Sequence, residues 1–179
     1  VRMSDGHIPR DAVNWLDKEL NKLKKDQPIV FLNHYPLDNG LDNWYEAIDR
    51  LKKKNTIAAL CGHGHANKAM NFEGIPAVMG RSNLRAKAEI GGYNLVDVRA
   101  DSMIFSERRP GLETRASWTG IRITKHDYQT SPASMRPSYA VNDSFPNVQA
   151  RWAYSSPANV ISTPATDGKL VFFGNSMGT

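Results

Sequence analysis

The sequence predicts an α/β fold, and three features support this prediction. Amphipathic segments suited to helices alternate with short apolar runs over about the first sixty residues. This alternation is typical of parallel strands joined by helical crossovers. Beyond Ala66 the pattern changes to short strand-like runs separated by glycines, which is typical of antiparallel strands joined by tight turns.

The first helix is expected to begin after Pro9, because proline suits the first turn of a helix. Apolar residues then recur at spacings of three and four, and they form one stripe: Val13, Leu16, Leu20 and Leu23. The helix should end before Gln27-Pro28, because the residue before a proline avoids the helical conformation. Trp15 and Trp44 are expected in the core.

Two continuous apolar runs, residues 29–32 and 56–61, predict strands that are buried on both faces. A second amphipathic helix between them carries its apolar residues on one side: Trp44, Ala47, Ile48 and Leu51. Functional side chains gather at the carboxyl ends of parallel strands. The loops that begin at Asn33 and Gly62 are therefore the expected location of a site.

The rest of the chain divides into strands and a linker. The predicted antiparallel strands are Lys68–Phe72, Ile75–Met79, Tyr93–Val98, residues 103–107 and residues 117–125. Residues 130–147 are rich in Ser, Pro and Asn without periodicity, which indicates a linker. We therefore expect three parts, with bounds at 1–110, 111–150 and 151–179.

Composition excludes some classes of protein. The 179 residues include 40% hydrophobic and 23% charged residues, which indicates a globular chain rather than a disordered one. No apolar run approaches the roughly 18 residues that a membrane helix needs. Cys61 is the one cysteine, so no intramolecular disulfide can form.

Charge leaves two interpretations open. The net charge of +5 would attract polyanions. The lysines at 22–25 and 52–54 also suit the negative ends of helix dipoles, and we favour that explanation. No basic patch interleaved with aromatic residues appears, so no nucleic-acid specificity is evident.

Histidines follow both predicted parallel strands directly, as Asn33-His34 and as Gly62-His63-Gly64-His65. Neutral imidazole is the commonest metal ligand in proteins. Gly62 and Gly64 would permit unusual backbone angles, which would let both rings turn to one point. Each motif alone could be structural, but together they predict a metal site formed by His34, His63 and His65.

The two histidine motifs resemble the closing half of the calcineurin-like metallophosphoesterases. They span residues 33–37 and 61–65. The resemblance covers roughly residues 1–110. It implies a four-layer αββα sandwich that binds two metal ions, such as Zn, Fe or Mn. It also implies that His34 and His63 bind one ion and His65 the other. Asn33 and Arg81 are candidate contacts to substrate, although Arg81 and Arg85 could equally be surface or interstrand arginines.

The family's opening motifs, which supply its bridging aspartate, are missing from this sequence. Asp5-Gly6-His7 matches the pattern Asp-x-His, but we interpret it as coincidence because it directly precedes the first helix. We therefore expect the chain to be a fragment of a longer protein. Alone, it should lack appreciable phosphoesterase activity, and its uncovered sheet edges could cause self-association.

The last segment resembles the opening of a quinoprotein-like (PQQ-like) β-propeller repeat. Pro164-Ala165 precedes a predicted strand, and Asp167-Gly168 predicts a hairpin turn. Residues 152–179 are fewer than the about 40–45 of a propeller blade. An ordinary terminal hairpin is the alternative. Fusions of this kind resemble exported bacterial proteins, which suggests a periplasmic or surface location.

The expected function is metal-dependent hydrolysis of phosphate mono- or diesters by the intact parent protein. The alternative is a non-catalytic, phosphoesterase-like scaffold that acts as a binding module together with a propeller. His126 was also considered as a catalytic residue, but it follows the last predicted strand and is expected at the surface beyond the domain.

Overall fold

The computed structural model describes residues 6–84, 90–128, 136–138, 140–156, 158, 160 and 162–178. Arg85 lies outside these residues. The chain divides into two compact units, and the larger one is Asp5–Pro137. The smaller unit runs from Ser138 onward.

Two helices of the larger unit follow the predicted apolar stripes. Helix α1 (Arg10–Lys22) buries Val13, Leu16 and Leu20, and helix α2 (Trp44–Leu51) buries Trp44, Ala47, Ile48 and Leu51. The core position predicted for Trp15 is wrong, because its side chain is 60% exposed. Trp15 precedes Leu16 directly, so it projects beside the buried stripe rather than within it.

The first sheet has four strands: β1 (Pro28–Leu32), β2 (Asn55–Cys61), β3 (Lys68–Phe72) and β4 (Ile75–Met79). Their order is β1-β2-β4-β3, with β2 parallel to both β1 and β4. Strands β3 and β4 form an antiparallel hairpin. Its turn, Glu73-Gly74, has positive φ at both residues, as a two-residue hairpin loop of this kind requires.

The second sheet is antiparallel and has three strands in the order β5-β6-β7. They are β5 (Tyr93–Val98), β6 (Ser102–Arg108) and β7 (Thr114–Arg122). The division expected near residue 110 falls within this sheet, because β7 pairs with β6. The larger unit continues to Pro137.

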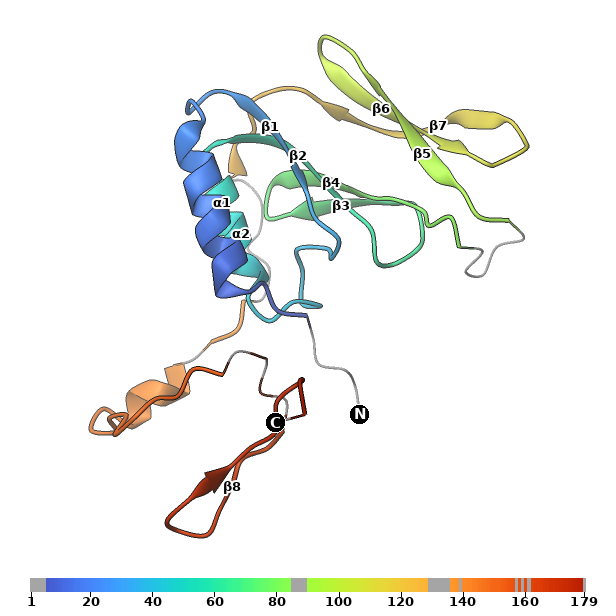
Figure 1. The fold of residues 1–179 in the computed structure, drawn as a ribbon. Helices are drawn as coiled ribbons and strands as arrows, with labels where there is room; N and C mark the ends of the chain where they lie inside the picture. The colour runs from blue at the N-terminus through green and yellow to red at the C-terminus, as the bar shows by residue number, and fades with distance from the viewer. Residues whose placement is uncertain are drawn as a thin grey trace. The chain divides into compact units, whose positions relative to one another are not determined.

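The larger unit is built in three layers, so the predicted mixed α/β class is confirmed (Figure 1). Helices α1 and α2 cover one face of the first sheet, where they pack on Ala59 and Ala77 among other residues. The second sheet covers the opposite face, where Phe105 of β6 lies in a cluster with Ala58 and Val78. Neighbouring residues of β2 and β4 thus serve different layers, as the alternation of side chains along a strand requires.

A segment that follows β7 is fastened to β2. The His126 ring donates from Nε2 to the Ile57 carbonyl at 3.1 Å, and the Tyr128 hydroxyl donates to the Thr56 carbonyl at 2.7 Å. His126 is half-buried within the larger unit, so its expected place beyond the domain is not what the structure shows. These bonds satisfy carbonyls of a buried strand, which would otherwise cost free energy.

The smaller unit contains a short 3-10 helix, η2 (Ala140–Ser144), and one hairpin. Strands β8 (Ala165–Thr166) and β9 (Val171–Phe172) pair antiparallel around Asp167-Gly168, as the sequence predicts. The Asp167 carboxylate accepts hydrogen bonds from the backbone N–H groups of Lys169 and Leu170, which fixes the turn. In the part of the chain that the structure describes, no helix has the length and apolar character needed to span a membrane.

Candidate metal centre

The loops after β1 and β2 lie side by side because these strands are parallel neighbours. Leu32 pairs with Leu60 near their carboxyl ends. The backbone pairing then continues beyond the strands, since the Gly62 N–H donates to the His34 carbonyl at 2.9 Å. Two histidine loops separated in sequence by a helix are thereby held against each other.

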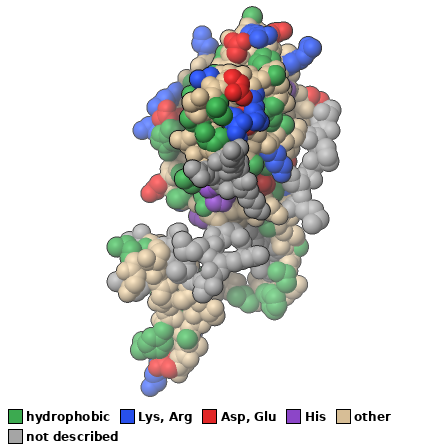
Figure 2. Space-filling view, turned by 90° about the vertical axis from the view of Figure 1, so that its right-hand side faces the viewer, with side chains coloured by type: hydrophobic (Ala, Val, Ile, Leu, Met, Phe, Trp, Pro, Cys, Tyr) green, Lys and Arg blue, Asp and Glu red, His purple; other side chains and the backbone are tan. Residues whose placement is uncertain are grey.

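His34 and His63 are brought together by this arrangement. Their ring centroids are 5.5 Å apart, and the ring planes are nearly perpendicular at 81°. Both side chains are exposed. Figure 2 shows histidine side chains gathered at the surface of the molecule. Two imidazoles this close can approach a common ion after small changes of χ angle.

Tyr35 completes a cluster of three rings with these histidines. Its ring centroid lies 4.0 Å from that of His63, with the planes inclined by 31°. It also meets the His34 ring edge-on at 5.4 Å. Sequence reasoning gave Tyr35 no role. Its position directly after His34, in a loop expected to carry the site, could have indicated that Tyr35 belongs to the site.

His63 and His65 both adopt left-handed backbone conformations, with φ of 67° and 57°. Such angles are uncommon outside glycine and cost roughly 1–2 kcal/mol each. Neither Gly62 nor Gly64 has positive φ, so the left-handed conformations of this motif lie at its histidines. Strained residues of this kind cluster at functional sites.

Gly64 packs closely against the side chain of Met79. A Cβ atom at this position would lie 2.6 Å from Sδ of Met79, which is a core residue of β4. At Gly62, the nearest atom to such a Cβ would be His34 Nδ1 at 3.7 Å, an ordinary contact. Of the two glycines, only Gly64 lies where a Cβ atom would crowd a neighbour, and that neighbour is the end of the flexible Met79 side chain.

His65 is exposed and does not join the pair in a three-ligand group. Among the described residues, no group of three or more His, Cys, Asp or Glu side chains is placed to hold a metal ion. Cys61, at the end of β2, is buried. Burial, together with the negative charge of Asp38, raises the pKa of the Cys61 thiol to about 11.

Asn33, a predicted substrate contact, faces its own loop. Its side-chain amide donates to the Tyr35 carbonyl, and its Oδ1 atom is buried without a hydrogen-bond partner among the described residues. The backbone N–H of Asn33 donates to the Leu60 carbonyl at 3.1 Å. Asn33 therefore helps to set the path of the loop that carries His34.

Arg81 is held in an ion pair between the two sheets. Its guanidinium donates to Glu107 of β6 at 2.7 Å, and both side chains are largely buried. It also donates to the Ile90 carbonyl. These are the contacts expected of an interstrand arginine, the alternative that the sequence left open. A contact to substrate remains a prediction.

Asn67 connects this ion pair to the second histidine loop. Its Nδ2 donates to Glu107 at 2.8 Å, while its Oδ1 accepts from the Arg81 backbone N–H at 2.9 Å. Asn94 donates to the same Oδ1 at 2.8 Å. Sequence reasoning missed Asn67, Asn94 and Glu107 because buried polar networks form between segments that are distant in sequence.

Neither a scan against protein-family models nor a search of curated proteins finds a match for this chain. The interpretation of the site therefore depends on the geometry of the histidines and on the chemistry of their side chains.

Proposed function

We propose that His34, His63 and His65 belong to a metal site that hydrolyses phosphate mono- or diesters in the intact parent protein. The observation that carries this proposal is the His34–His63 pair, with centroids 5.5 Å apart at the carboxyl ends of neighbouring parallel strands. The left-handed backbone at His63 and His65 also supports the proposal, because strained backbone conformations cluster at functional sites.

Histidine nitrogens suit Zn, Fe or Mn rather than Ca. When bound, such ions polarise a phosphoryl group and lower the pKa of a coordinated water. This chain's contribution would be to position imidazoles. The hydrogen bond from the Gly62 N–H to the His34 carbonyl holds the loops after β1 and β2 together, and Tyr35 orients the His63 ring. Because neutral imidazoles leave a dication's charge uncompensated, carboxylate ligands would have to complete such a site.

The three observed layers of the larger unit are compatible with part of a four-layer αββα sandwich. We propose that the fourth layer and further strands belong to the parent protein. We also propose that the β8–β9 hairpin opens a β-propeller repeat, which is supported by the Asp167-Gly168 turn. A non-catalytic scaffold remains the second candidate, and the absence of a three-ligand group among the described side chains favours it.

Turnover of bis-p-nitrophenyl phosphate by the parent protein tests this proposal. With metal added, we expect activity that His63→Ala lowers by more than the roughly 10–100-fold typical of losing an outer-sphere partner. His126→Gln is the matched control, since glutamine can still donate to the Ile57 carbonyl. Equal activity of all three proteins would show that His63 takes no part in the reaction, and no activity in the parent would favour the scaffold.

A further inference from the structure

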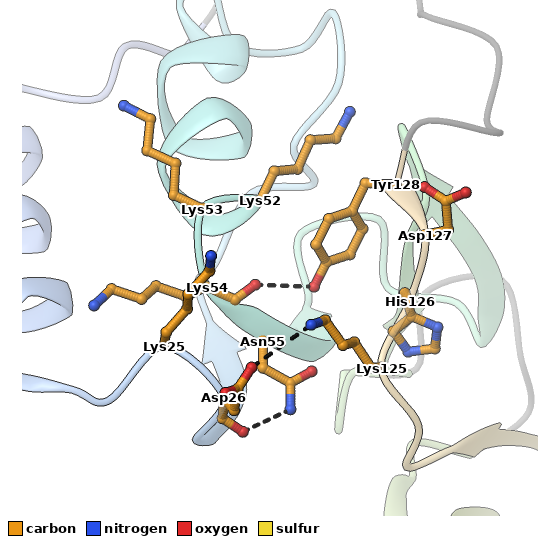
Figure 3. Close-up of a pocket in the computed structure, with 10 residues that line it drawn as sticks. All are labelled: Lys25, Asp26, Lys52, Lys53, Lys54, Asn55, Lys125, His126, Asp127 and Tyr128. Atoms are coloured by element: carbon orange, nitrogen blue, oxygen red, sulfur yellow. Dashed lines mark hydrogen bonds and ion pairs between the residues drawn. The ribbon is translucent and has the colours of Figure 1, made fainter.

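A basic cavity of about 470 Å³ lies at the end of the first sheet opposite to the histidine loops (Figure 3). It is bounded by the turns that follow α1 and α2, by the start of β2 and by the segment after β7. Five of its ten described lining residues are lysines. The cavity is thus separate from the proposed metal centre, which lies at the carboxyl ends of the same strands.

Two of these lysines are already engaged by the protein. The Lys52 amino group pairs with the buried Glu73 carboxylate at 3.1 Å. Lys54 donates to the Leu23 carbonyl at 2.8 Å and so caps the end of α1. Lys52 is therefore held by Glu73, and Lys54 is held at the end of a helix.

The other three are available to a ligand. The side chains of Lys25 and Lys53 are exposed and make no hydrogen bond or ion pair with any residue that the structure describes. Lys125 lies 3.6 Å from Asp26, but both groups are largely exposed, so this pair is weak.

Helix dipoles explain only part of this arrangement. They favour basic residues within the last turn of a helix, which are Lys22 in α1 and Arg50 in α2, whereas the cavity lysines follow the ends of these helices. Lys125 reaches the cavity from the segment after β7, which is tied to β2 by His126 and Tyr128. Asp26 and Asp127 offset part of the positive charge, and the lysines outnumber them.

We propose that this cavity binds a small, multiply phosphorylated anion. Its volume falls in the roughly 300–1,000 Å³ range of small-molecule sites. Lysines act as point charges rather than as geometric clamps, so a ligand that carries several phosphates gains more from them than one with a single phosphate. The Asn55 side chain holds the Asp26 carbonyl at 3.0 Å, which fixes one wall for such a ligand.

Calorimetric titration with inorganic triphosphate, in the presence of a metal chelator, tests the proposal. We expect the Lys25→Gln/Lys53→Gln protein to bind at least tenfold more weakly than the wild type. A Lys18→Gln/Lys68→Gln protein has the same net charge and loses two exposed lysines outside the cavity, so it should bind as the wild type does. Equal weakening in both variants, or no binding by the wild type, overturns the proposal.

Two further titrations sharpen the test. A His34→Ala/His63→Ala protein should bind triphosphate normally, which separates this cavity from the metal centre. A duplex DNA oligonucleotide should bind more weakly than triphosphate. If the cavity lysines affect DNA binding and leave triphosphate binding unchanged, the site is a nucleic-acid surface and the proposal is wrong.

Discussion

Arg81 and Glu107 form an ion pair of 2.7 Å that joins the loop after β4 to strand β6, and so connects the two sheets of the larger unit. Their side chains are only 12% and 11% exposed. Asn67 binds both partners, and it lies two residues after His65. The ion pair thereby fixes the loop that carries two of the candidate metal ligands.

Replacing Glu107 should destabilise the protein strongly. Glu107→Ala would leave the Arg81 guanidinium buried without its carboxylate, which typically costs about 3–5 kcal/mol. Urea denaturation measures the free energy of unfolding. Asp97→Ala is the control, because its pair with Arg99 is more than half exposed and should contribute less than about 1 kcal/mol. Equal losses in the two variants would show that burial of the Arg81–Glu107 pair is unimportant.

Much of the fold follows from local sequence patterns. Hydrophobic periodicity gave the helices and most strands, because many of these elements place apolar side chains in one of two core clusters. Strand β1 was predicted to be buried on both faces, and this is wrong because Leu32 is 70% exposed. Three strands, β3, β4 and β5, have the bounds predicted from sequence. The parallel pairing of β4 with β2 did not follow from local patterns, since a sheet's strand order depends on contacts between distant segments.

The candidate site was predictable only in part. The proximity of His34 and His63 follows from two parallel strands that end in histidine loops. The left-handed conformation of His63 and His65 does not, because residue type would have assigned those angles to the glycines. The Asn67–Glu107 bond joins residues far apart in the chain, and no spacing rule indicates it.

Strain at His65 should be measurable as a difference between two substitutions. His65→Gly should be more stable than His65→Ala by about 1 kcal/mol, because glycine removes the Cβ clash at φ 57°. Thermal denaturation compares them. Ala66→Gly is the control: Ala66 is an exposed neighbour without positive φ, so glycine should lower stability by roughly 0.5–1 kcal/mol. Equal stability of the two His65 variants would exclude strain at this residue.

The acidic carboxylate of Glu73 should make stability depend on pH. Its hydrogen bond from Arg136, together with one from Lys52, lowers the pKa of Glu73 below its ordinary value, although burial opposes this. A lowered pKa stabilises the fold above the pKa of the unfolded state, and this stability is lost as pH falls through the folded pKa. The difference in unfolding free energy between wild type and Glu73→Gln should therefore be largest near pH 7 and shrink below about pH 4.5. A constant difference over this range would contradict the prediction.

Tyr128 should make stability fall as the pH rises, whereas Glu73 makes it fall as the pH decreases. Burial raises the pKa of its hydroxyl above the ordinary 10, although bonding to Thr56 opposes this. The neutral form is thus favoured in the fold, so its stabilising effect is complete below pH 10 and declines as pH rises through the folded pKa. Tyr128→Phe should cost about 1 kcal/mol at pH 7. The gap between wild type and Tyr128→Phe should narrow above pH 10, and a gap that stays constant would contradict this account.

Binding of Co²⁺ to this chain, followed by the visible absorption of the ion, tests most directly whether the histidine loops form a metal site. Wild-type protein and His126→Gln should give the same imidazole-bound spectrum and the same affinity. His34→Ala and His63→Ala should each weaken binding at least tenfold. Identical titrations for all four proteins would show that the neighbouring rings of residues 34 and 63 hold no metal ion.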